Sequence, residues 1–187
     1  LEGLLSPTGD PIADALLMTT GSAPAGHALV ESLGHPLTPL VPSLFTFNIK
    51  DPRLQDLAGV AFETAHLTLT FKDGKDRLER QGPLLITHWG LSGPAVLKLS
   101  AFGAVLLQAS GYQATLKVDF VPARGGLSGV MAELRRYKDE HPKQSVSKNN
   151  PFSEIPKRFW ARLGQAAGLA EDDIYADLTK TAMQTMA

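Results

Sequence analysis

The chain has 187 residues, which fits one domain of ordinary size or two small ones. Hydrophobic residues make up 43% and charged residues 20%, values typical of a globular protein, so a disordered or fibrous chain is excluded. The 18 basic and 19 acidic residues leave a formal net charge of −1, which argues against a strongly basic nucleic-acid binder.

The sequence contains no cysteine, which excludes disulfide frameworks, thiolate zinc sites and cysteine nucleophiles. No apolar run reaches the roughly 18 residues that a membrane-spanning helix needs, and no secretory signal opens the chain. We therefore expect a cytoplasmic protein with no membrane partner. The chain begins with Leu1 instead of Met, and its last apolar pattern runs to the final residue, so we expect a piece of a longer protein.

The N-terminal region predicts a strand, a helix and an extended segment, in that order. The apolar run at residues 15–19 is typical of a short buried strand. Residues 24–33 are expected to form a helix, because Pro24 suits a first turn and Gly34 is placed to end the last one. Three prolines then exclude regular helix and favour an extended crossing between domains: Pro36, Pro39 and Pro42.

Residues 43–123 form a predicted β region. The stretch 66–71 alternates in polarity, which indicates a strand with one buried face. An Asp-Gly pair at residues 73–74 follows it and is a strong hairpin signal. Residues 94–102 are apolar on nearly every face and predict a buried helix. Other β stretches are the aromatic run at 44–49 and the predicted strands at 84–87 and 114–120.

The last third of the chain, residues 124–187, is predicted to be helical. Two amphipathic patterns repeat apolar residues at helical spacing, and a third continues to the end of the chain. Residues 141–151 are polar and bounded by prolines, so we expect a loop there. The apolar positions of the three patterns are Leu127, Val130, Met131 and Leu134; Ile155, Phe159, Trp160 and Leu163; and Ile174, Leu178 and Ala182.

The segment 82–97 carries the most information about function. It places G-L-S-G-P at residues 90–94 between a predicted strand and a predicted helix, which resembles the G-x-S-x-G turn of hydrolases. Pro94 replaces the final glycine of that motif, and the sequence lacks repeated βαβ patterns, so we do not assign Ser92 as a nucleophile. The structural alternative is that Ser92 caps the helix, with Pro94 in its first turn.

The same helix start offers a binding surface. Free amide groups at a helix N-terminus favour negative charge and polar ligand atoms, so we expect a binding surface at Thr87, His88, Gly90, Ser92 and Gly93. His88 alone among them exchanges protons near pH 7, which makes it the candidate catalytic residue. The alternative is that His88 is a hydrogen-bonded structural residue at the end of a strand.

Other chemistry receives little support from the sequence. The five histidines lack the spacing of metal-ligand motifs, so no metal site is expected, and neither G-x-G-x-x-G nor a P-loop occurs. Basic pairs at residues 135–136 and 157–158 lie on amphipathic helices, but interspersed acidic residues favour solvated helix faces over a nucleic-acid surface. A non-enzymatic module that binds RNA or protein through its helical region stays open as the alternative to an enzyme.

Two stretches of the sequence resemble one known family. The first combines A-L-L-M-T-T-G-S at residues 15–22 with S-L-G-H at 32–35 and P-L-V-P-S-L at 39–44. The second is G-P-L-L-I-T-H-W-G-L-S-G-P-A at residues 82–95, and its order Thr-His-x-Gly-x-Ser-Gly-Pro is the specific feature. Both resemble the BaiN-type NAD(P)/FAD-dependent oxidoreductases, bacterial flavoproteins that include aminoacetone oxidase-like proteins.

That resemblance implies an α+β fold: a small, mostly antiparallel β-barrel, a helical subdomain, and an N-terminal strand–helix remnant of a Rossmann-like domain. Residues 1–40 would be the edge of the FAD-binding domain, residues 41–123 the barrel-like part of an insert domain, and residues 124–187 its helical subdomain. Family members commonly carry A-T-G-G where this chain has T-T-G-S, and the matching positions imply cofactor contacts at Gly21 and Ser22. Taken without the resemblance, residues 19–22 are typical of an ordinary loop after a buried strand.

The resemblance also implies a function. The chain would be the substrate-covering insert domain of a FAD-dependent oxidoreductase, with NAD(P)H as its electron donor. The surface at Thr87, His88, Gly90, Ser92 and Gly93 would then face the substrate or the flavin. Its partners would be the remaining flavin-binding domain of the same protein and a small-molecule substrate. Because the chain lacks a dinucleotide fingerprint, we expect it to bind no cofactor and to show no activity by itself.

Overall fold

The computed structural model describes residues 8–10, 15–71, 74 and 76–187 of the chain. The chain divides into two compact units, Leu1–Leu40 and Val41–Ala187. The Asp-Gly turn predicted at residues 73–74 lies partly outside the described residues, because Asp73 is not among them. None of the described helices combines the length and the apolar character that crossing a membrane requires.

The first unit contains helix α1 (Pro24–Ser32), close to its predicted bounds. Gly34 follows the helix in a left-handed conformation with a φ of 85°, and its N–H donates to the Glu31 carbonyl at 2.9 Å. The strand predicted at residues 15–19 is wrong: these residues form no regular element, and Leu17 is 85% exposed. A strand needs a neighbouring strand for its backbone groups, and the described part of this unit contains none.

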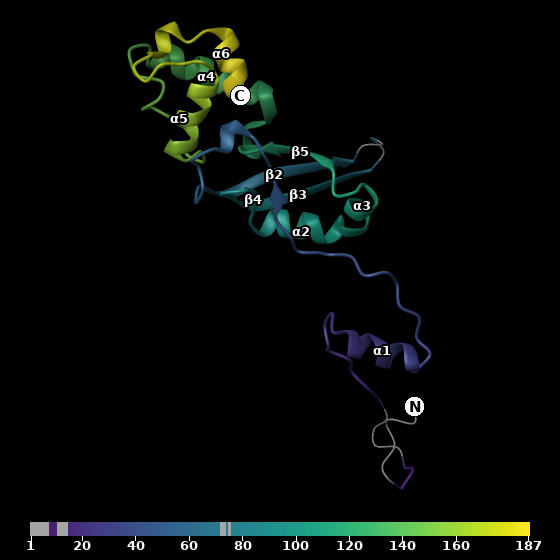
Figure 1. The fold of residues 1–187 in the computed structure, drawn as a ribbon. Coiled ribbons are helices and arrows are strands. Elements are labelled where there is room, and N and C mark those ends of the chain that lie inside the picture. The colour runs from purple at the N-terminus through teal and green to yellow at the C-terminus, as the bar shows by residue number, and fades with distance from the viewer. Residues whose placement is uncertain (1–7, 11–14, 72–73, 75) are drawn as a thin grey trace. The chain divides into compact units, whose positions relative to one another are not determined.

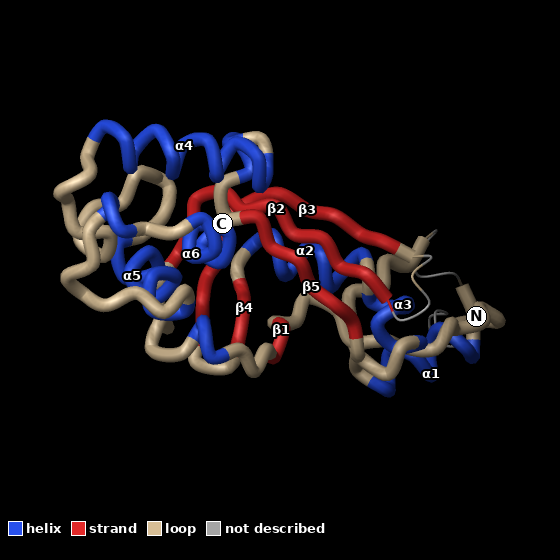
Figure 2. Tube along the Cα trace, turned by 90° about the horizontal axis from the view of Figure 1, so that it is seen from above, coloured by secondary structure: helices blue, strands red, loops and turns tan. Residues whose placement is uncertain are grey.

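The second unit is built around one antiparallel sheet with the strand order β1-β4-β3-β2-β5. The sheet curls into a half-barrel, and β1 and β5 are its two edges (Figures 1 and 2). With the helices described below, this confirms the predicted α+β fold with a small antiparallel barrel. The strands are β1 (Phe47–Asn48), β2 (Ala61–Phe71), β3 (Arg77–Thr87), β4 (Gly90–Ser92) and β5 (Ala114–Asp119).

The two long strands, β2 and β3, extend beyond their predicted bounds. They pair with each other along most of their length, with His66 opposite Gln81. A β-bulge interrupts the register between Phe62 and Ala65, so two residues of β2 face a single position of β3. Cross-strand pairing therefore lengthens each strand past the stretch in which its apolar pattern is visible.

Helices α2 (Pro94–Phe102) and α3 (Ala104–Ala109) lie against one face of the sheet (Figure 1). The buried helix predicted at residues 94–102 is confirmed, since Val96 and Leu99 are fully buried. Helix α3 is absent from the predicted elements, because its six residues are too few to show a periodicity.

The remaining helices gather at one end of the sheet (Figure 1) and are α4 (Gly126–Glu140), α5 (Lys157–Ala166) and α6 (Lys180–Met186). The first two amphipathic helices of the prediction are confirmed as α4 and α5. The third is shorter than predicted, because Ile174 pairs with Ser145 in an isolated β-bridge and α6 begins only after Thr179. The Thr179 hydroxyl accepts from the Ala182 N–H at 3.1 Å and caps that helix.

Residues 141–151 form a loop, as predicted, but long-range contacts hold its backbone. Trp160 Nε1 donates to the Val146 carbonyl at 2.6 Å, and the Tyr175 hydroxyl donates to the Asn149 carbonyl at 2.6 Å. The loop is therefore well packed despite its polar composition. The described residues of this unit also include short 3₁₀ turns: η2 (Pro52–Leu54), η3 (Pro122–Arg124) and η4 (Tyr175–Asp177).

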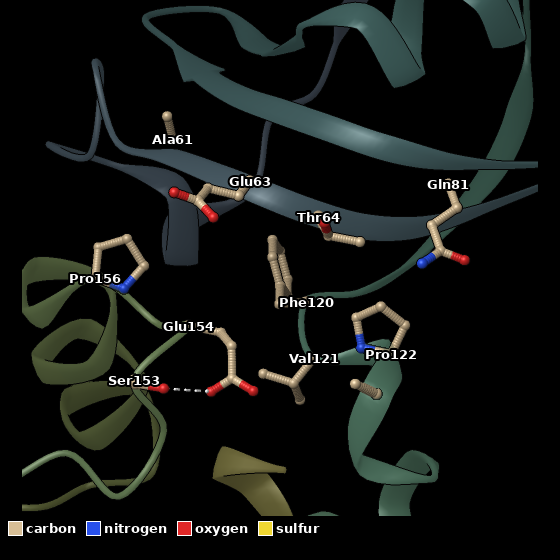
Figure 3. Close-up of a pocket in the computed structure, with 11 residues that line it drawn as sticks. Ala61, Glu63, Thr64, Gln81, Phe120, Val121, Pro122, Ser153, Glu154 and Pro156 are labelled. Atoms are coloured by element: carbon tan, nitrogen blue, oxygen red, sulfur yellow. Dashed lines mark hydrogen bonds between the residues drawn. The ribbon is translucent and has the colours of Figure 1, made fainter.

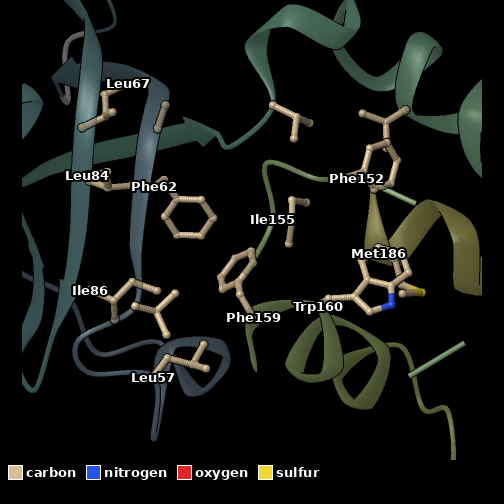
Figure 4. Close-up of a cluster of buried hydrophobic side chains, with 14 of the residues drawn as sticks. Leu57, Phe62, Leu67, Leu84, Ile86, Phe152, Ile155, Phe159, Trp160 and Met186 are labelled. Atoms are coloured by element: carbon tan, nitrogen blue, oxygen red, sulfur yellow. The ribbon is translucent and has the colours of Figure 1, made fainter. Parts of the chain in front are cut away.

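One hydrophobic core joins the half-barrel to the helices (Figure 4). Phe62 of β2, Phe120 after β5 and Phe159 of α5 meet there, with ring centroids 4.6 to 5.0 Å apart. At the edge of this contact, the Arg162 guanidinium donates to the Gln55 carbonyl at 2.8 Å. Shared apolar burial is thus the main force that holds sheet and helices together.

Candidate functional site

The predicted site segment forms the hairpin between β3 and β4. Thr87 and Gly90 pair across it, and Thr87 Oγ1 donates to the Gly90 carbonyl at 3.2 Å. His88 and Trp89 occupy the two turn positions, and both are exposed. No described residue hydrogen-bonds to the His88 ring, which counts against the alternative of a structural histidine. The imidazole is therefore accessible to a ligand.

Trp89 is 54% exposed, although burial of its large ring would be favourable. Its Nε1 donates to Thr46 Oγ1 at 3.3 Å, and its carbonyl accepts the Ile49 N–H at 2.9 Å. The hairpin tip thus presents an oriented aromatic surface next to His88 in the chain. Trp89 is not among the site residues predicted from the sequence. The sequence signal that could have identified it is a large aromatic residue inside a predicted turn.

Close backbone packing explains both glycines among the predicted site residues, Gly90 and Gly93. A Cβ on Gly90 would lie 2.2 Å from the Phe47 carbonyl oxygen, and one on Gly93 would lie 2.9 Å from the Pro83 carbonyl oxygen. Gly93 also has a φ of 101°, which side chains with a Cβ rarely allow. Neither contact needs a ligand, so the expected approach of these glycines to a substrate stays a prediction.

The prediction that Ser92 caps helix α2 is wrong. Ser92 is the last residue of β4, where it pairs with Leu85, and Gly93 is the residue that precedes the helix. No side chain caps α2, whose first residue, Pro94, has no N–H to satisfy. Ser92 Oγ makes no hydrogen bond with any described residue, so no base is in place to activate it as a nucleophile.

Gly21 and Ser22, the predicted cofactor contacts, belong to the first unit and form the turn before α1. Gly21 has a φ of 56°, and its carbonyl oxygen lies 3.1 Å from His27 Nε2. Gly26 packs so tightly on this turn that a Cβ there would lie 2.0 Å from Thr20 Oγ1. The turn is compact but lacks the glycine fingerprint of a dinucleotide site.

A cleft of about 640 Å³ lies within the second unit, between the bulge of β2 and the segment before α5 (Figure 3). Glu63 and Thr64 of the bulge line one side, Ser153 and Glu154 line the other, and Phe120 lies between them. None of the predicted site residues lines this cleft. Its two carboxylates disfavour an anionic ligand such as a phosphate.

Glu154 is engaged in an ion pair at the rim of this cleft. Arg124 donates to both of its carboxylate oxygens, at 2.9 and 2.8 Å. Hydrogen bonding to Arg124 holds the pKa of the Glu154 carboxyl below its ordinary value. Glu154 therefore ties the segment before α5 to η3 instead of serving as a free acid or base. Elsewhere in the described part of the chain, no group of His, Asp and Glu side chains is arranged to hold a metal ion.

Comparison with known proteins decides the family. The family model described as "HI0933-like protein barrel and H2TH domain" matches residues 41–187, which are also the second compact unit. The chain belongs to this family. Its members are flavoprotein-like oxidoreductases, so the resemblance seen at residues 82–95 is confirmed at that level.

Three curated relatives are similar to the chain. Ribosomal RNA dihydrouridine synthase of Haemophilus influenzae is 29% identical over 170 residues, which are 89% of this chain and 37% of that protein. The Escherichia coli protein of the same name is 30% identical over 145 residues, 78% of this chain and 32% of that protein. The 3-dehydro-bile acid delta(4,6)-reductase of Clostridium scindens is 35% identical over 103 residues, 54% of this chain and 24% of that protein. The chain thus spans only 24% to 37% of the length of these relatives.

Proposed function

We propose that this chain is the substrate-covering insert domain of a flavin-dependent reductase. The observation that carries the proposal is the family match over residues 41–187, joined to relatives whose names describe reductions. In this proposal residues 1–40 are the edge of the FAD-binding domain, residues 41–123 the barrel-like part of the insert, and residues 124–187 its helical subdomain.

The names of the relatives indicate one kind of reaction. Dihydrouridine is uridine whose ring C=C bond is saturated, and the bile acid reductase is named for the double bonds at positions 4 and 6. Saturation adds a hydride and a proton, and a positioned ionisable group supplies the proton. His88 is our candidate for that group, because its imidazole is exposed at the hairpin tip and an imidazole can give and take a proton. Thr87, Gly90, Ser92 and Gly93 would border the same surface.

FAD and NAD(P)H are the cofactors that we propose for the whole protein. The described residues of this chain do not form a dinucleotide cradle, because the turn before α1 contains a single glycine, Gly21. The flavin would be held by parts of the parent protein outside this chain, with Gly21 and Ser22 at the edge of its site. This chain would contribute orientation of the substrate and exclusion of water.

RNA is the substrate class that we favour over a free small molecule. The two relatives named for ribosomal RNA align with 89% and 78% of this chain, against 54% for the bile acid reductase. Helix α4 balances its basic residues with Glu133, Asp139 and Glu140. Helix α5 carries three basic residues and no acidic one, so its charge is compatible with RNA contact. The alternative, a non-enzymatic module that binds RNA or protein, requires no flavin in the whole protein.

An absorption spectrum of the whole parent protein tests this proposal. We expect visible flavin bands that bleach when NADH or NADPH is added without oxygen. The bands should return faster when a uridine-containing fragment of ribosomal RNA is supplied than when a 3-oxo-4,6-diene steroid is supplied. A protein that holds no flavin after incubation with FAD, yet binds RNA, would support the non-enzymatic module instead.

A further inference from the structure

The half-barrel has an open side, and a groove of about 520 Å³ lies along it. The groove is lined by residues of and next to β1 and β5. Each of these strands lacks a strand partner on its outer side within the described residues (Figure 2). Buried side chains, Leu69 and Leu107, contribute to its lining. It shares no lining residue with the cleft of Figure 3 and contains none of the predicted site residues.

Aromatic rings form part of this groove. Phe45 meets Phe47 and Tyr112 edge to face, with ring centroids 6.2 and 6.1 Å away. Tyr112 is 47% exposed, and its φ of 58° is left-handed, a conformation that is unfavourable for a bulky residue. Its N–H donates to the Leu107 carbonyl at 2.7 Å, which holds the turn after α3. A tyrosine therefore lies at the groove where glycine would fit the backbone better.

The polar side chains of the groove have no partner within the described part of the chain. The amides of Asn48 and Gln113 and the ammonium of Lys50 make no hydrogen bond or ion pair with any described residue. All three residues are exposed. Lys50 is the only charged residue among the described residues that line the groove, so its charge favours an anionic ligand.

We propose that this groove binds an unpaired nucleotide of an RNA strand. The base stacks on the exposed ring of Tyr112, the amides of Asn48 and Gln113 hydrogen-bond to the edge of the base, and Lys50 contacts a phosphate. Stacking on an aromatic ring combined with a cationic contact is the usual way in which proteins hold single-stranded nucleic acid. The inference deepens the proposed function and rests on it for the choice of RNA.

A protein strand from another part of the parent chain is the competing occupant, because β1 and β5 are both edges. Strand addition relies on a row of backbone groups, of which β1 offers only two residues and β5 offers six. It leaves the amides of Asn48 and Gln113 and the charge of Lys50 without a role. The chemistry of the side chains therefore favours a nucleotide.

Anisotropy of a fluorescein-labelled hexauridylate mixed with the 187-residue chain tests the proposal. Tyr112→Gly removes the ring at a position whose backbone suits glycine, so the fold is expected to persist. We expect this variant to weaken binding at least about fivefold, as the loss of one stacked base requires. Lys50→Gln should reduce the slope of log K against log salt by about 0.7, the value for one phosphate contact on a single strand.

Two matched controls separate the groove from general surface effects. Phe102→Ala removes an aromatic ring that is 69% exposed outside the groove, and Lys98→Gln removes an exposed lysine of α2. Both should bind hexauridylate as the unaltered chain does. The proposal is overturned if the unaltered chain does not bind at millimolar concentration, or if Tyr112→Gly and Lys50→Gln bind as tightly as the controls.

The same titration on the whole parent protein distinguishes the remaining outcomes. If the isolated chain binds hexauridylate and the whole protein does not, a protein segment occupies the groove and the proposal is wrong. If the whole protein holds a reducible flavin and its groove variants bind RNA normally, the proposed function stands and the groove proposal is wrong. If the whole protein holds no flavin but its RNA binding depends on the groove residues, the groove proposal is kept and the proposed reductase function is wrong.

Discussion

Gly90 of β4 packs directly against Phe47 of β1, since a Cβ on Gly90 would lie 2.2 Å from the Phe47 carbonyl oxygen and 2.6 Å from the Ile49 nitrogen. This close contact lets the short edge strand β1 pack against the hairpin that carries His88 and Trp89. The position of the hairpin tip therefore depends on the absence of a side chain at residue 90.

Gly90→Ala should destabilise the chain by about 2 kcal/mol or more, because backbone atoms of β1 have to move. Gly164→Ala is the matched control: a Cβ there meets Leu169 at an ordinary 3.8 Å, inside helix α5. That variant should be neutral or more stable by up to about 1 kcal/mol. Urea unfolding of both variants measures the difference, and equal stabilities would show that β1 is not seated as described.

Trp160→Phe should destabilise the chain by about 1–3 kcal/mol, because it leaves the Val146 carbonyl without the 2.6 Å hydrogen bond from Trp160 Nε1. Trp89→Phe removes a similar bond to Thr46 at an exposed position and should change stability by less than about 0.5 kcal/mol. Urea unfolding again provides the measurement. A small effect at residue 160 would mean that the loop 141–151 is not held by this bond.

Arg124→Gln should raise the pKa of the Glu154 carboxyl toward its ordinary value near 4.5. The native pKa lies below that value, so the stabilisation from this pair is present at neutral pH and is lost as the pH falls through the lowered native pKa. An NMR titration of the Glu154 side-chain carbonyl follows the change. Arg135→Gln, at an exposed position of helix α4, is the control and should leave that pKa where it is.

The 187-residue chain alone should not bind FAD at micromolar concentration, because it lacks the glycine turn that holds a pyrophosphate at a helix N-terminus. Isothermal titration calorimetry with FAD is the direct measurement. Binding at micromolar affinity or tighter would show that the turn at Gly21 and Ser22 forms a more complete site than its single glycine implies.

Helices whose apolar spacing and proline starts agree are the elements that sequence predicts well. Helices α2 and α5 both begin beside a proline, at Pro94 and after Pro156. Helix α5 buries the face that its spacing indicates, and α2 is buried as its apolar composition predicts. The run at residues 15–19 fails for the opposite reason. Apolar composition indicates that burial would be favourable. A strand also needs a neighbouring strand for its backbone hydrogen bonds, and no local sequence pattern reveals whether one is present.

The candidate site is harder to predict because short-range signals compete there. Ser92 has the composition of a helix cap, but its pairing with Leu85 in β4 places it in the sheet instead. Strand β4 has three residues, too few for any periodicity. The groove joins Lys50 to Tyr112, which are far apart in sequence, so only the folded sheet brings them together.

The most direct test of the central claim, that the hairpin at His88 serves the reduction, compares His88→Ala with His35→Ala in the whole parent protein. The quantity measured is the rate at which substrate reoxidises the reduced flavin. His88 is exposed in the hairpin turn, so its loss should leave the melting temperature and flavin content unchanged. We predict a rate at least about tenfold lower for His88→Ala, equivalent to roughly 1.4 kcal/mol of transition-state stabilisation, and no change for His35→Ala. An unchanged rate per folded flavoprotein in His88→Ala would contradict the account and make the hairpin purely architectural.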